Sequence, residues 1–199
     1  MSKEFLYRGI ENLVYAEVLT DDETGYTTGE VKKLAPVAEI GKETETSSEP
    51  KYYDNKPLVI VDTVGTDEVT LTVAGIPVEV LAEITGQFYD EALGAMIEGE
   101  RTPKYFAIGY EAKKTNGTKV VVWRLKGKFN IPADTYVTED DGTDANGQEL
   151  TWTGIITSHK FTKNGAGARA LIVHTDAGDA DVSAFFDTVT TPDTLKATA

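Results

Sequence analysis

The chain has 199 residues, 40% hydrophobic and 26% charged, so a single domain over residues 1–199 with an ordinary hydrophobic core is expected. The absence of cysteine excludes disulfides, zinc–thiolate sites and thiol nucleophiles. The formal net charge of −14 disfavours a protein that reads nucleic-acid sequence, because an acidic surface repels phosphate groups. The sequence contains no recognisable secretory leader and no apolar run of membrane-helix length. Synthesis in the cytoplasm, with no membrane partner, is therefore expected.

Strands are expected to dominate, because Thr, Val and Tyr are frequent and many segments alternate apolar and polar residues with period two. The clearest examples are Glu68 to Val73, where Val69, Leu71 and Val73 share a face, and Tyr105 to Ala112. Further strands are predicted at Leu13 to Leu19, Val31 to Ile40, Leu58 to Val61, Lys126 to Ile131, Glu149 to Phe161 and Ala170 to His174. Short, turn-rich connections favour antiparallel pairing.

Asn116-Gly117 predicts a β-hairpin that leads into a strand from Lys119 to Leu125, because this dipeptide readily forms a type I′ turn. Two segments compete as helices. Pro77 to Thr85 begins with proline and is followed by Gly86, and Asp181 to Val189 begins with an acidic capping residue. The expected fold is mainly β, an antiparallel β-sandwich or partly closed barrel with one or two short flanking helices.

Two polar stretches interrupt the β pattern. Residues 41–57, GKETETSSEPKYYDNKP, contain no aliphatic side chain and are predicted to form a long loop. Residues 134–149 carry six acidic residues and no basic one, and they predict an acidic loop. Both loops are either mobile surface segments or segments that become ordered against a neighbouring subunit.

The sequence assigns no catalytic, cofactor-binding or metal-binding residue. His159 and His174 are the only histidines, lie 15 residues apart and accompany no G-x-S-x-G motif, so a structural or exposed role is favoured. The acidic loop fails the EF-hand register and leaves at most a weak cation site. The chain is therefore expected not to be an enzyme, although a hydrolase with paired carboxylates is retained as a distant alternative.

Four segments resemble the major tail proteins, or tail-tube proteins, of siphovirus-type phages and prophages of Gram-positive bacteria. They are Lys32 to Pro57, Val78 to Tyr110, Thr138 to Gly154 and Phe185 to Leu195, and with the strands between them they span nearly the whole chain. The resemblance implies the tail-tube fold and a structural virion protein. Such subunits form rings, usually hexameric, that stack into the tube through which phage DNA is ejected.

The resemblance also implies partners and roles for the two loops. The partners are further copies of the chain, tail-length, tail-tip and tail-completion proteins, and DNA in transient non-specific contact. Residues 41–57 would contact the adjacent ring; the candidate contact residues are Glu43, Glu45, Tyr52, Tyr53 and Asp54. The acidic loop would face a neighbour, the exterior or the lumen, through Glu139, Asp140, Asp141 and Asp144. The alternative function is a monomeric β-sandwich binding module, of the tail-tip or carbohydrate-binding kind.

Overall fold

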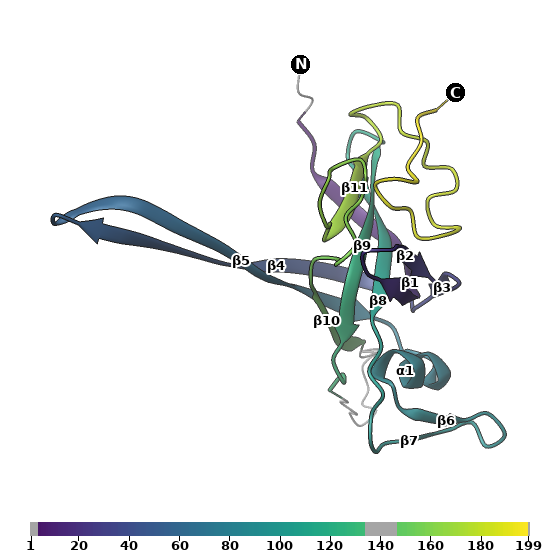
Figure 1. The fold of residues 1–199 in the computed structure, drawn as a ribbon. Coiled ribbons are helices and arrows are strands. Elements are labelled where there is room, and N and C mark those ends of the chain that lie inside the picture. Colours follow the sequence, from purple (N-terminus) through teal and green to yellow (C-terminus); the bar gives the residue numbers. More distant parts are fainter. Residues whose placement is uncertain (1–3, 134–146, 199) are drawn as a thin grey trace, which may run out of the picture.

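An antiparallel sheet of nine strands dominates the computed structural model, which describes residues 4–133 and 147–198 (Figure 1). The strand order is β2-β1-β8-β9-β10-β5-β4, with β11 also paired to β9 and β3 to β1. These strands are β1 (Tyr7–Asp21), β2 (Tyr26–Thr28), β3 (Lys32–Lys33), β4 (Val37–Tyr53), β5 (Lys56–Val73), β8 (Phe106–Lys114), β9 (Lys119–Phe129), β10 (Gln148–Gly154) and β11 (Ala170–His174). The prediction of a mainly β, antiparallel fold is confirmed.

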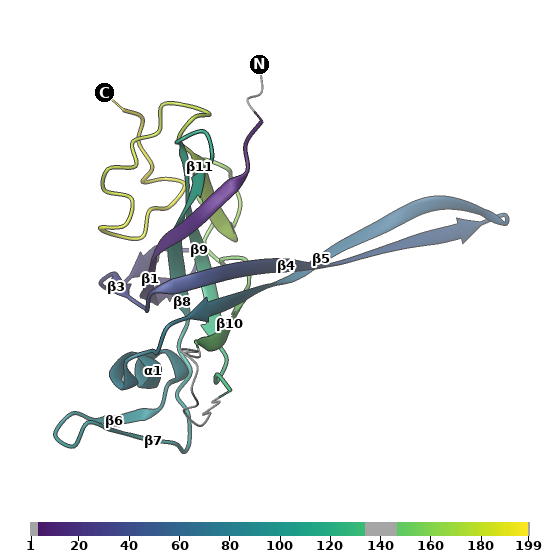
Figure 2. The same ribbon diagram turned by 180° about the vertical axis from the view of Figure 1, so that it is seen from behind.

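Both faces of the central strands are buried, so successive residues enter two different hydrophobic clusters. Phe106 and Ile108 of β8 lie in the first cluster with Trp152, whereas Ala107 lies in the second with Trp123. The predicted shared face of β5 is confirmed, because Val69, Leu71 and Val73 all belong to the first cluster. The segment after β10 covers the second cluster through Phe161, Phe185 and Val189, and its yellow end lies beside the sheet in Figure 2.

The sheet curls around the first cluster, so that β4 approaches β1 although no backbone pairing joins them. The helix α1 (Val78–Thr85) adds Ile84 to this cluster. The fold is therefore a sandwich-like, incompletely closed sheet with one helix in the described residues. A small hairpin of β6 (Phe88–Asp90) and β7 (Ala95–Ile97), which the sequence analysis did not predict, follows the helix.

The first predicted helix is confirmed and the second is wrong. α1 follows Pro77 and ends at Gly86, whose φ of 72° is the left-handed conformation that glycine adopts easily. Residues 181–189 form turns instead of a helix. The Phe185 carbonyl, which a helix would engage internally, accepts hydrogen bonds from the Trp123 indole N–H at 2.8 Å and the Thr190 hydroxyl at 2.9 Å.

The β8–β9 hairpin is confirmed, but its turn is not type I′. Gly117 has a φ of 85°, whereas Asn116 is not among the non-glycine residues with positive φ. The Gly117 N–H donates to the Lys114 carbonyl and the Lys114 N–H to the Thr118 carbonyl, which gives a longer loop with glycine at its left-handed position.

Several predicted strands have different boundaries in the structure: Leu13 to Leu19 is part of the longer β1, and Leu58 to Val61 and Glu68 to Val73 are parts of the single strand β5. Val31 to Ile40 is divided into β3 and the start of β4, with Pro36 in the break, and Lys126 to Ile131 continues β9 only as far as Phe129. The strand predicted over Glu149 to Phe161 ends at Gly154. Beyond it, the Asp21 carboxylate accepts the backbone N–H groups of Ser158 and His159, which fixes this segment in an irregular conformation.

Candidate interface formed by the β4–β5 arm

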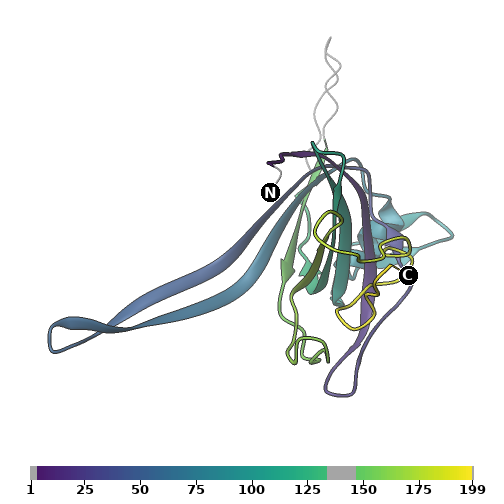
Figure 3. The same ribbon diagram turned by 90° about the horizontal axis from the view of Figure 1, so that it is seen from above.

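The predicted loop at residues 41–57 is instead the outer part of a long β-hairpin. β4 and β5 pair along their whole length, and residues 44–66, which we call the arm, extend beyond the sheet as a two-stranded ribbon (Figures 1 and 3). The last residue of β5 that β10 pairs is Asp67, opposite Gly154. Outward from this point neither strand of the arm has a further strand partner in the described residues.

The arm ends in a tight turn at Asp54 and Asn55, whose φ angles are 47° and 60°. Two consecutive positive φ angles between the paired residues Tyr53 and Lys56 define a type I′ turn, whose twist matches that of the flanking strands. The turn type expected at Asn116-Gly117 is therefore found at the arm tip, where aspartate and asparagine tolerate the left-handed conformation.

Both faces of the arm carry large apolar side chains. Because Pro50 pairs with Ile60 and Lys51 with Val59, the alternation of a strand assigns the remaining residues to faces. One face carries Tyr52, Ile60 and Val64, and the other carries Tyr53, Val59 and Val61. All six are exposed, from 44% for Val61 to 64% for Tyr52 and Ile60.

An isolated two-stranded ribbon is marginally stable in water, because it has no core to bury its side chains against. Here the β4 half of the arm is polar and the β5 half is apolar, and within residues 4–133 and 147–198 no other segment covers the large apolar side chains of either face. The unpaired backbone N–H and C=O groups at both edges of the ribbon can also form hydrogen bonds with a strand of another chain. The arm therefore has the composition and shape of a surface that becomes buried in an assembly.

The predicted contact residues separate into a group at the tip of the arm and a group at or inside its root. Tyr52, Tyr53 and Asp54 lie together at its tip. Glu43 pairs with Glu68 inside the sheet, and Glu45 lies at the bulge where the arm begins. Glu139, Asp140, Asp141 and Asp144 of the predicted acidic loop lie outside the described residues.

The sequence analysis predicted a strand from Leu58 to Val61 but did not identify it as an exposed apolar surface. The run is in β5, but Leu58 is 70% exposed and marks a second bulge, between the pairs of Lys51 and Tyr52. The available signal was its position directly after the polar stretch 41–57, which contains the turn residues Asp54 and Asn55. A strand that pairs with such a stretch across a short turn meets mainly polar residues on its partner strand.

A buried carboxylate, Asp67, anchors the root of the arm. The Thr44 hydroxyl donates to Asp67 Oδ1 at 2.7 Å, and Arg124 Nη1 lies 3.4 Å from Oδ2. Lys42 Nζ and Arg169 Nη1 approach Oδ1 at 3.6 Å and 3.8 Å. Arg124 is buried as well and also donates to the Tyr110 hydroxyl.

Arg169 extends this anchor onto the arm itself. Its guanidinium donates to the carbonyl of Gly65 and, at 3.2 Å, to the carbonyl of Val64. Both carbonyls lie at the bulge between the pairs of Thr44 and Thr46, where the strands leave the sheet. Directional hydrogen bonds thus connect the root of the arm to the body.

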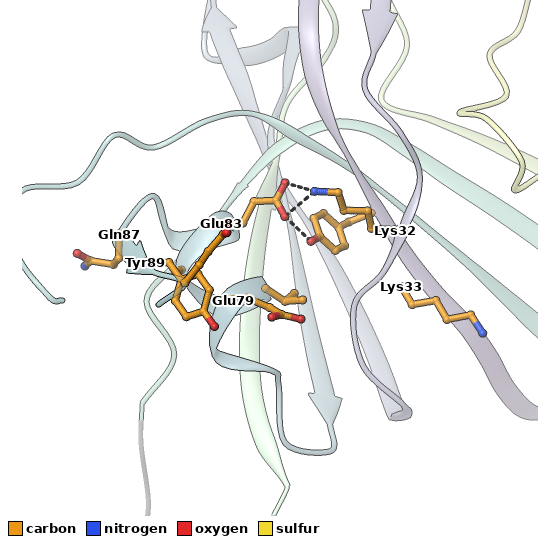
Figure 4. Close-up of a pocket in the computed structure, with 10 residues that line it drawn as sticks. Lys32, Lys33, Glu79, Glu83, Gln87 and Tyr89 are labelled. Carbon is orange, nitrogen blue, oxygen red and sulfur yellow. Dashed lines mark hydrogen bonds and ion pairs between the residues drawn. The ribbon is translucent and has the colours of Figure 1, made fainter. Parts of the chain in front are cut away.

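A separate hollow of about 730 Å³ lies between α1 and the β1–β3 edge (Figure 4). Glu83 points from α1 towards Lys32, with Nζ 2.8 Å from Oε1, and accepts a hydrogen bond of 2.7 Å from the Tyr15 hydroxyl. Burial of the hydroxyl is the larger cause, and the hydrogen bond to Glu83 the second, that raise the pKa of Tyr15 above its ordinary value of 10.0. Tyr15 thus keeps its proton at neutral pH. The contacts of Glu83 with Tyr15 and Lys32 connect α1 to the sheet.

Each of the two histidines packs against an aromatic ring. His159 packs edge-on against Phe161 at 5.0 Å between ring centres, and its backbone N–H donates to Asp21. His174 lies at the end of β11 and packs near Phe5. Among residues 4–133 and 147–198 no cluster of three or more metal-ligating side chains is found, and no helix there has the length and apolarity to cross a membrane.

Comparison with models of known protein families gives no match, and comparison with curated proteins gives no significant match.

Proposed function

We propose that this chain is a structural subunit of a phage tail tube, which assembles with copies of itself into stacked rings. The observation that carries the proposal is the arm, whose two faces both carry exposed apolar side chains with no cover within the described chain. The resemblance of the sequence to major tail proteins supplies the kind of assembly. In this proposal the arm is the contact to the next copy and has no catalytic role.

The arm can supply a large part of the energy needed for association. Complete burial of a Val, Leu or Ile side chain contributes about 1.5–3 kcal/mol. The run from Leu58 to Val61 is 44–70% exposed, so its burial adds on the order of 5 kcal/mol before the costs of association are subtracted. That is a substantial part of the free energy of a micromolar contact, about 8 kcal/mol.

The asymmetry of the contact favours rings or tubes. An arm that binds a different surface of the next copy makes a heterologous contact, and repetition of such contacts closes into a ring or continues as a filament. Hexameric rings around a DNA-conducting lumen follow from the family resemblance. The net charge of −14 then supports a lumen that repels DNA and holds it only in transient contact.

The arm does not favour the alternative of a monomeric carbohydrate-binding module. Such a module requires a flat platform of exposed aromatic rings. Tyr52 and Tyr53 are both exposed, but they are consecutive strand residues and therefore point to opposite faces of the ribbon.

Negative-stain microscopy of the purified chain at high concentration tests the proposal. Rings or tubes about 100 Å wide, roughly two domain diameters plus a channel, are expected. The double variant Val59→Thr/Ile60→Thr keeps β-branched residues but removes apolar surface, so it should stay monomeric. The matched control Leu93→Thr/Ile97→Thr changes exposed aliphatic residues on the β6–β7 hairpin and should assemble normally. Equal assembly of both variants, or compact monomers alone from the unmodified chain, would refute the proposal.

A further inference from the structure

A groove of about 510 Å³ opens beside the root of the arm, at the seam where β4 approaches β1. Its buried floor is made of Tyr110, Val120 and Val122, and its exposed rim includes Tyr7 and Ile172. The volume lies within the range of about 300–1,000 Å³ typical of binding pockets, and the aliphatic and aromatic lining suits an apolar occupant.

The rim of this groove also presents a free strand edge. β11 pairs with β9 and, in the described residues, with no other strand. Ile172, in the middle of β11, is 53% exposed. An incoming strand can therefore form backbone hydrogen bonds with β11 while its side chains enter the groove, as in strand addition to a sheet edge.

Charge indicates which partner fits this groove. The tip of the arm, residues 50–60, carries Lys51, Lys56 and a single acidic residue, Asp54, in a chain whose net charge is −14. Lys51 is paired at 2.6 Å with Glu49, just outside this range, so Lys56 is the lysine of the tip that remains available for a partner. Lys56 and, at the groove, Glu39 both lack an ion-pair partner within the described chain.

We propose that the groove receives the arm tip of a second copy of this chain, with Ile60 or Val59 against the apolar floor and Lys56 beside Glu39. The inference rests on the proposed function and names the receiving surface for the arm. The arm of the same copy projects away from the sheet, and its root borders the groove, so its tip has no short return path (Figure 3). Each copy then offers one arm and one groove, which makes the contact heterologous.

Disulfide trapping tests the contact directly, because the chain has no cysteine of its own. Equal amounts of the variants Ile60→Cys and Ile172→Cys are mixed under mild oxidation, and the linked heterodimer is measured on a non-reducing gel. Val59→Cys with Ile172→Cys tests the other face of the arm. Leu93→Cys with Ile172→Cys is the matched control, since Leu93 is 79% exposed but lies off the arm.

One of the two arm variants should give at least about ten times more heterodimer than the control, because trapping follows proximity. Yields equal to the control from both arm variants would overturn the inference. So would a linked homodimer of Ile60→Cys alone as the main product, since that outcome means that arms pair with arms.

Charge reversal provides a second measurement. Lys56→Glu is added to the cysteine variant of the arm, or Glu39→Lys to Ile172→Cys. Each reversal should lower the yield of linked heterodimer about threefold, because an exposed ion pair contributes modestly. The two reversals together should restore it. Failure of the restoration would exclude the Lys56–Glu39 register.

The same samples separate this inference from the proposed function. Rings or tubes without trapping between arm and groove would reject the groove as the receiving surface and retain the tube. Trapping in particles that never form rings or tubes would retain the groove contact and reject the tube.

Discussion

Replacement of Asp67 by asparagine tests whether the charge cluster at the root of the arm stabilises the fold. Asparagine keeps the shape of the side chain, and its Oδ1 still accepts the hydrogen bond of the Thr44 hydroxyl. The variant therefore removes the negative charge and little else. Arg124, with a side chain only 7% exposed, is left facing a neutral group.

The expected loss can be derived from this geometry. Removal of one partner of a buried ion pair costs about 3–5 kcal/mol, because the other charge stays buried without compensation. The lower end applies here, since the Arg124–Asp67 contact is 3.4 Å long and Arg124 keeps its hydrogen bonds to the Tyr110 hydroxyl. We expect a loss of about 3 kcal/mol in the free energy of unfolding, which at an m-value of about 2 kcal/mol/M lowers the urea midpoint by about 1.5 M.

Equilibrium unfolding in urea, followed by the fluorescence of the buried Trp123 and Trp152, measures this loss. Asp62→Asn is the matched control. Asp62 lies on the exposed arm, so its substitution should change the free energy of unfolding by less than about 0.5 kcal/mol. If the midpoints of the two variants agree, the root cluster does not stabilise the fold, and the argument from buried charge fails.

Two further predictions concern the body of the protein. A hydrogen bond from Lys114 is the main cause that lowers the pKa of Asp176 from 3.8 to about 2, so the stabilisation is complete above about pH 4 and is lost towards pH 2. Asp176→Asn should be less stable than the unmodified chain above pH 4 and converge with it near pH 2 in thermal melts; a constant difference would contradict this. Gly127→Ala places a methyl group against the Trp152 indole and should cost about 1–3 kcal/mol, whereas Gly99→Ala, in open space, should leave the melting temperature unchanged.

The sequence predicted those elements whose side chains face a core. The shared face of Val69, Leu71 and Val73 was readable because burial of that face imposes alternation on β5. α1 was readable because Pro77 and Gly86 mark its ends. Residues 181–189 have a helical pattern as well, but the Phe185 carbonyl is engaged by Trp123 and Thr190, and such tertiary bonds leave no trace in local sequence.

The arm was not predictable as a hairpin for a related reason. Neither of its faces packs on the body, so no alternation of polar and apolar residues is imposed on β4 or β5 beyond Asp67. The polar half of the ribbon then has the composition of a loop, and its apolar half has that of a buried strand. The Asp54-Asn55 turn was the one local signal, and it is weaker than Asn-Gly in hairpin statistics.

The arm also resolves a conflict between the charge of the molecule and its proposed self-assembly. Copies with a net charge of −14 repel one another, but at physiological ionic strength the repulsion between exposed charges decays over about 8 Å. The outer part of β4, residues 45–53, spans about 30 Å at the rise of a strand, several times that decay length. The arm tip, with two lysines and one aspartate, therefore reaches a neighbour before the acidic bodies interact strongly. Acidity can keep the bodies apart in solution while the arm makes the first contact, and the apolar run from Leu58 to Val61 then supplies the energy that holds it.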